Sequence, residues 1–106
     1  MAEAEQYRIE GSDEYLEGFE ELPAGHQRRV KRFVDQHLRH APSMPISGMK
    51  ALRGQHRGLY QFMVSMRHGT RLLYRIDEEQ KVVRLEYCGS HPSWSPTRAR
   101  GNVRNL

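Results

Sequence analysis

The stretch that decides the fold reads GTRLLYRIDE from Gly69 to Glu78 and then KVVRLEYCGSH from Lys81 to His91. Apolar and polar residues alternate in both parts, which is typical of strands with one buried face. The polar residues 77–80, between the two alternating parts, match a hairpin turn in length. We therefore expect strands over residues 70–77 and 81–88, preceded by another over residues 59–64.

The alternation divides these strand residues between two faces. One set is apolar and is expected to pack beneath helices: Tyr60, Phe62, Val64, Leu72, Tyr74, Ile76, Val83, Leu85 and Tyr87. The other set is rich in arginine: Gln61, Met63, Arg71, Leu73, Arg75, Arg84 and Glu86. Its arginines would form a cationic platform on an open sheet face, and an ordinary solvated face is the alternative.

Helical patterns lie nearer the N-terminus. Residues 7–10 alternate like a first strand, and Ser12 before two acidic residues is an N-cap signal for a helix over residues 13–22. A second helix with a basic outer face is expected over about residues 25–40, with Pro42 beyond its end. Because the link between the helices is short, we expect an antiparallel helical hairpin.

Length and composition indicate one α+β domain over residues 1–95, followed by a basic, flexible tail over residues 96–106. The lone Cys88 excludes an intramolecular disulfide, and zinc-site spacing is absent. Residues 1–6 are acidic and lack the apolar segment of a signal peptide, and no apolar run approaches the length of a membrane span. We expect a cytoplasmic protein with no membrane partner, cofactor or metal.

The net charge of +4 is unevenly distributed. Residues 1–22 carry eight acidic groups and one arginine, a net of −7, whereas residues 23–106 carry five acidic groups and 16 Lys+Arg, a net of +11. A basic body suits a polyanionic partner. Ordinary solubilising charge is the alternative.

Four segments together resemble the RelE/ParE superfamily of bacterial type II toxins, over roughly residues 5–95. They are Leu52-Arg53-Gly54, Leu59-Tyr60-Gln61-Phe62, the stretch from Gly69 to Asp77, and Tyr87-Cys88-Gly89-Ser90-His91. The resemblance implies an N-terminal helical hairpin packed on a small twisted antiparallel sheet. RelE-like members are ribosome-dependent mRNA endonucleases, and ParE-like members poison DNA gyrase. Both kinds are held inactive by a cognate antitoxin, so a hetero-oligomer with that partner is implied.

The resemblance also assigns positions in a site. Arg71 stands where RelE-like nucleases place a phosphate-stabilising arginine. His91 stands where the YafQ- and HigB-like branches place a histidine, and Trp94 or Ser95 lies near the position of an aromatic residue there. Gln61 and Met63 occupy the strand on which RelE carries two lysines, and this departure favours a histidine-based variant.

Metal-free RNA cleavage needs a base, an acid and a cation, and histidine and arginine supply these at neutral pH. We expect Arg71, His91 and His68 to be catalytic, with His56 as an alternative to His68. The expected RNA contacts are Lys50, Arg53, Gln61, Arg75, Arg84 and Trp94, the last by stacking on a base.

Each assignment has a structural alternative. Arg71 could pair with Glu86 across neighbouring strands, His91 could be a plain loop residue, and Trp94 could plug a sheet edge. The other histidines near the second helix, namely His26, His37 and His40, are expected to be solvated. The leading hypothesis is a toxin that cleaves mRNA on the ribosome with mRNA and ribosome as partners. The alternatives are a gyrase poison and a non-catalytic antitoxin-binding module.

Overall fold

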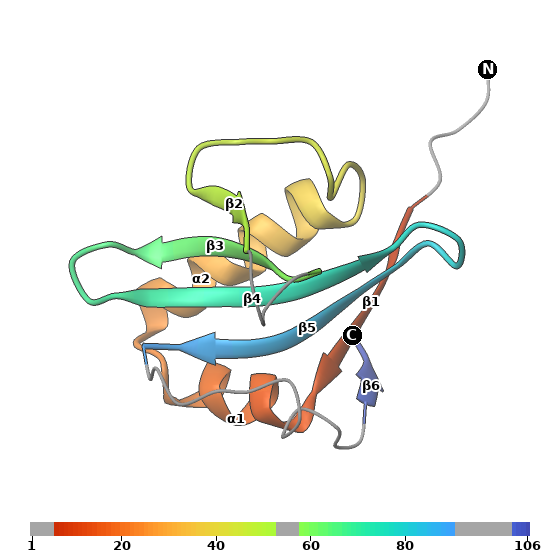
Figure 1. The fold of residues 1–106 in the computed structure, drawn as a ribbon. Helices are drawn as coiled ribbons and strands as arrows, with labels where there is room; N and C mark the ends of the chain where they lie inside the picture. The colour runs from red at the N-terminus through yellow and green to blue at the C-terminus, as the bar shows by residue number, and fades with distance from the viewer. Residues whose placement is uncertain (1–5, 53–57, 91–102) are drawn as a thin grey trace.

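A computed structural model of the chain describes residues 6–52, 58–90 and 103–106 (Figure 1). Its centre is an antiparallel meander of β3 (Tyr60–Ser65), β4 (Thr70–Asp77) and β5 (Val82–Gly89). These are the three strands expected from the alternating sequence. The described strands form one six-stranded sheet in the order β2-β3-β4-β5-β1-β6.

The outer strands differ from the expected arrangement. β1 (Arg8–Ser12) runs parallel to β5, so the sheet is mostly, not wholly, antiparallel. β2 (Met49–Ala51) forms the edge beside β3. β6 (Val103–Asn105) pairs antiparallel with β1, within the segment expected to be a flexible tail. A three-residue strand carries too little alternation to be recognised in sequence.

Two helical segments cover one face of the sheet (Figure 1). α1 (Asp13–Glu21) begins at Ser12, whose side chain accepts a hydrogen bond from the Tyr15 N–H, as the N-cap signal predicted. α2 (Ala24–Phe33) continues as a π-helical stretch over Val34–Leu38. Among the residues described, no helix has the length and apolarity needed to cross a bilayer.

The main core lies between these helices and the sheet. Phe33 of α2 stacks on Phe62 of β3 with ring centroids 3.7 Å apart and an interplanar angle of 5°. Most of the apolar set predicted from the alternation is buried here, together with residues of α1, α2 and β1. The fully buried side chains include Ile9, Val30, Leu38, Val64, Leu72, Tyr74, Val83, Leu85 and Cys88.

A β-bulge in β5 overturns the predicted position of Tyr87. Leu73 pairs with Tyr87 whereas Tyr74 pairs with Leu85, so Glu86 is the extra residue. An extra residue reverses the alternation beyond it. Tyr87 therefore packs on the opposite face against Leu73, and Cys88 takes the place in the core.

Candidate functional site

Arg71 lies on the open sheet face, near the end where the β3–β4 turn projects. Its Nε donates to the Gly69 carbonyl at 3.3 Å, and its Nη1 donates to Gln61 Oε1 at 3.4 Å. The side chain is half-buried, and its remaining N–H groups have no hydrogen-bond partner within the described ranges. A guanidinium held in this way presents a fixed set of donors to a phosphate.

The same turn carries His68. Its Nδ1 lies 3.0 Å from the Ser65 hydroxyl oxygen, which also accepts from the His68 backbone N–H at 3.4 Å. A hydroxyl can either donate to Nδ1 or accept from it, so this contact serves both protonation states of the imidazole. Nε2 is the nitrogen left for proton transfer. Arg71 and His68, both predicted site residues, are thus linked through one turn.

His68 also borders a cleft of about 720 Å³ between the helices and this end of the sheet. His26, in the first turn of α2, lies edge-on to His68 with ring centroids 5.2 Å apart. Glu14, Glu17 and Glu21 of α1 form an acidic wall; the remaining lining is Gly18, Leu22, Pro23, Thr70, Tyr87, Cys88, Gly89 and Ser90. Two imidazoles and three carboxylates thus border one cleft.

The expectation that His26 is solvated is wrong. Its side chain is half-buried, and Nδ1 is buried without a hydrogen-bond partner among the described residues. His37 is also half-buried, stacked on Phe33 at 5.3 Å, whereas His40 is exposed as expected. A single histidine at the start of a helix carries no periodic signal, so the sequence alone could not place His26 beside His68.

The open face is not a continuous cationic platform. Buried Leu59 and Leu73, with Leu52 and Tyr87 packed against them, form a small apolar cluster in its middle. Leu73 was expected on this face, but the cluster divides the arginines into two groups. Arg71 lies at one end and the cross-strand neighbours Arg75 and Arg84 lie toward the other. A polyanion crossing the face would meet an apolar centre between these cations.

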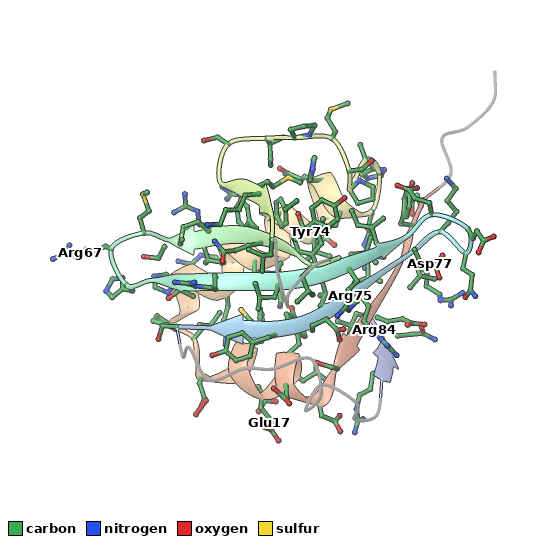
Figure 2. All side chains as sticks on the ribbon, viewed as in Figure 1. Glu17, Arg67, Tyr74, Arg75, Asp77 and Arg84 are labelled. Atoms are coloured by element: carbon green, nitrogen blue, oxygen red, sulfur yellow. The ribbon has the colours of Figure 1, made fainter. Side chains whose placement is uncertain are left out.

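Arg75, rather than Arg71, pairs with Glu86. Arg75 Nε donates to Glu86 Oε2 at 3.0 Å, and the Glu86 side chain is 5% exposed. Burial raises the pKa of Glu86 above its usual value, against the opposing effects of the hydrogen bond from Arg75 and the charge of Arg84. Arg75 and Arg84 lie side by side in Figure 2. The alternative in which Arg71 pairs with Glu86 is therefore wrong.

The other predicted site residues fall into two groups. Lys50 is exposed on β2 and is the cross-strand neighbour of Gln61, which is only 5% exposed and serves as an acceptor for Arg71. The second group lies outside the described residues and comprises Arg53, His56, His91 and Trp94. Within the described ranges, no three His, Cys, Asp or Glu side chains are grouped as a metal site.

The known proteins that match this chain are solved structures. No protein-family model matches the sequence, and no curated protein matches it significantly. Among solved structures, a chain of the RelBE2 toxin–antitoxin complex from Mycobacterium tuberculosis has a TM-score of 0.64 at 24% identity, covering 81% of this chain and 99% of that one. The archaeal RelE–RelB complex from Pyrococcus horikoshii gives 0.66 at 22% identity, covering 84% and 99%.

A third structure, described as a YoeB/ParE toxin from Agrobacterium tumefaciens, gives a TM-score of 0.68 at 14% identity, covering 79% of this chain and 98% of that one. Nearly the full length of each of these chains is therefore matched. At such low identities the likeness concerns architecture, which many activities can share. The expected α+β architecture is confirmed, and the chain has the fold found in RelE and YoeB toxins.

Proposed function

We propose that this protein is the toxin of a type II toxin–antitoxin system and that it cleaves mRNA in the ribosomal A site. The observation that carries the proposal is the arrangement at one end of the sheet. There, the Arg71 guanidinium is fixed by Gly69 and Gln61, and the turn that fixes it also presents His68. The fold shared with RelE and YoeB toxins supports the same conclusion.

The proposed reaction is metal-free transesterification. A histidine removes the proton from the 2′-hydroxyl, and the 2′-oxygen forms a bond to phosphorus as the bond to the 5′-oxygen breaks. A second proton donor protonates the leaving 5′-oxygen, and Arg71 stabilises the charge on the phosphorus-bound oxygens. The products are a 2′,3′-cyclic phosphate, open to hydrolysis to a 3′-phosphate, and a 5′-hydroxyl. His68 and His91 are the proposed proton-transfer groups.

The test is primer extension on a defined mRNA, with and without translating ribosomes. We expect ribosome-dependent cuts by the wild-type protein and a loss of roughly 100-fold in Arg71→Ala, the scale for removing one charge-stabilising donor. His91→Ala is expected to lose activity as well. The matched control is Arg8→Ala, because Arg8 is exposed and pairs with Val82 at the opposite end of β5. Full activity in folded Arg71→Ala would overturn the site assignment.

A second candidate is a gyrase poison that cuts nothing itself. It is favoured by β3, where Gln61 is buried and Met63 half-buried at the positions of the two RelE lysines. Cells expressing such a protein would filament and show a DNA-damage response while their mRNA stayed intact. A folded protein that causes no growth arrest would instead indicate a module that only binds an antitoxin. A helical antitoxin segment folding on the toxin is the proposed partner in every case.

A further inference from the structure

We propose that His26 is a positioning residue for His68, holding that imidazole in one orientation with Nε2 left for proton transfer. This inference deepens the proposed nuclease function and rests on it. Its basis is the geometry of the two rings, 5.2 Å apart with an interplanar angle of 61°, at the border of the 720 Å³ cleft. The two residues lie far apart in the sequence, His26 on α2 and His68 in the β3–β4 turn.

His68 needs a second contact to be fixed. It is exposed, and the neighbouring Arg67 extends into solvent from the same turn (Figure 2). The hydrogen bond between Nδ1 and the Ser65 hydroxyl holds one edge of the ring but leaves rotation about that contact. An aromatic ring packed edge-on removes this remaining freedom. Ser65 and His26 together therefore define the direction in which Nε2 points.

His26 itself is held at the junction between α1 and α2. The next residue, Gln27, donates from its backbone N–H to the Pro23 carbonyl at 3.0 Å and from its side chain to the Phe19 carbonyl at 2.8 Å. The start of α2 is thus tied to the end of α1. His26 Nδ1 is buried and has no hydrogen-bond partner within the described ranges. The side chain is therefore held by the packing of its ring against His68.

The charged and titratable groups around the pair come from two other elements. Glu14, Glu17 and Glu21 border the cleft from α1, and Tyr87 and Cys88 border it from β5. The carboxylates disfavour entry of a phosphate into the cleft. A scissile phosphate is therefore expected at the Arg71 side of the turn, within reach of a correctly oriented His68, rather than between the helices.

The first test measures orientation without requiring catalysis. Nuclear Overhauser contacts and three-bond couplings of the His68 side chain report the direction of its ring. We expect a single His68 ring orientation, in contact with the His26 ring, in the full-length wild-type protein. We expect averaging in His26→Ala and the wild-type orientation in His26→Phe, which keeps an aromatic ring but no nitrogen. The matched control is His40→Ala, because His40 is exposed and does not border the cleft. An unchanged His68 signal in His26→Ala would overturn the proposal.

The second test separates positioning from direct proton transfer. In the ribosome-dependent cleavage assay, His26→Ala should lower kcat about tenfold with KM unchanged, because a mispositioned proton-transfer group weakens only the chemical step. His26→Phe should retain most of the activity. Equal loss in both variants would show that a nitrogen of His26 is required and would overturn a positioning role. If the wild-type protein makes no cuts, the nuclease function fails, and the spectra alone decide the inference.

Discussion

At the scale of single residues, Ser12 connects three parts of the fold. Its hydroxyl accepts from the Tyr15 N–H at 3.1 Å, capping α1, and donates to the Glu86 carbonyl at 2.7 Å in the bulge of β5. The residue is 1% exposed and lies at the end of β1. One buried hydroxyl therefore satisfies a helix donor and a strand acceptor that water cannot easily reach.

Ser12→Ala removes both hydrogen bonds at once. We expect a loss of about 2–3 kcal/mol in the free energy of unfolding, from the lost cap and the buried carbonyl left without its partner. Urea denaturation monitored by circular dichroism measures it. Ser43→Ala is the control, since Ser43 is exposed, and it should change stability by less than ~0.5 kcal/mol. A similarly small effect in Ser12→Ala would contradict this account of the cap.

Glu86 is a buried acid whose desolvation outweighs its ion pair with Arg75. Burial raises its pKa above the ordinary value of 4.5, so the folded protein holds this proton more tightly than the unfolded chain. The free energy of unfolding must then fall as pH rises from about 4.5 through the raised folded pKa. Below that pH range, Glu86 is protonated in both the folded protein and the unfolded chain, so it does not make the free energy of unfolding depend on pH.

Glu86→Gln should remove this component of the pH dependence. The amide oxygen can still accept a hydrogen bond from Arg75, and the uncharged side chain costs less to bury. Equilibrium unfolding from about pH 4, just below the ordinary carboxyl value, to about pH 8 should show a flatter profile than the wild type. Glu79→Gln is the control, because Glu79 is exposed. Parallel profiles for Glu86→Gln and the wild type would refute the predicted cost of burying Glu86.

At the scale of elements, α1 and β5 approach each other unusually closely at Gly18. A Cβ atom at this position would lie 1.9 Å from the Cys88 carbonyl oxygen, which belongs to backbone. The contact brings the helix down onto the strand just beyond the bulge, and it places Gly18 and Cys88 together in the cleft lining. The lack of a side chain at Gly18 thus shapes the cleft.

Gly18→Ala should separate these two elements. We expect the free energy of unfolding to fall by about 3 kcal/mol, because the backbone must move to accommodate the new methyl group. Thermal and urea denaturation both measure this. Gly25→Ala is a matched helical control, since its nearest contact is the Arg28 side chain at 3.8 Å, and it should be neutral or stabilising by up to ~1 kcal/mol. An equally neutral Gly18→Ala would show that α1 can shift freely.

At the scale of the whole molecule, the sheet joins segments from both ends of the described chain. β1 is held between β5 on one side and β6 on the other (Figure 1). Next to β6, the Leu106 N–H donates to the Ile9 carbonyl at 2.9 Å, and Arg39 Nη2 donates to the Leu106 carbonyl at 3.2 Å. The C-terminal residues thus cover an edge of β1 and contact the helical layer.

Deleting residues 103–106 should expose that edge. We expect the free energy of unfolding to fall by about 2 kcal/mol. The deletion removes several backbone hydrogen bonds worth roughly 1 kcal/mol each, and part of this loss is offset because the deleted residues no longer have to be ordered on folding. Aggregation at high protein concentration should also increase, because an uncovered edge strand can pair with another chain. Urea denaturation and light scattering measure the two effects. Arg104→Gln, which removes only the exposed contact with Asp13 at 3.8 Å, should leave both unchanged.

Several features followed from local patterns in the sequence. The alternation in residues 59–64 and 70–77 predicted β3 and β4, and the Ser12 signal predicted α1, because period and capping depend on neighbouring residues. Arg71 and His68 were expected as site residues from their residue types and from the resemblance; Arg71 lies in β4 and contacts Gly69 of the turn that carries His68. The roles of Arg71, His68, Arg53, His91 and Trp94 all stay predictions.

Other features required contacts between distant residues. The parallel pairing of β1 with β5, the β6 edge and the bulge at Glu86 depend on which strands meet, and local alternation does not specify that. The same reason explains why His26 was expected in solvent yet lies against His68, and why Glu86 pairs with Arg75. The longer strands, the two helices and most of their apolar faces follow from residues close along the chain, whereas the short strands β2 and β6 and the face of Tyr87 do not. Only the tertiary structure decided the partners of the charged and titratable side chains, because those partners come from different elements.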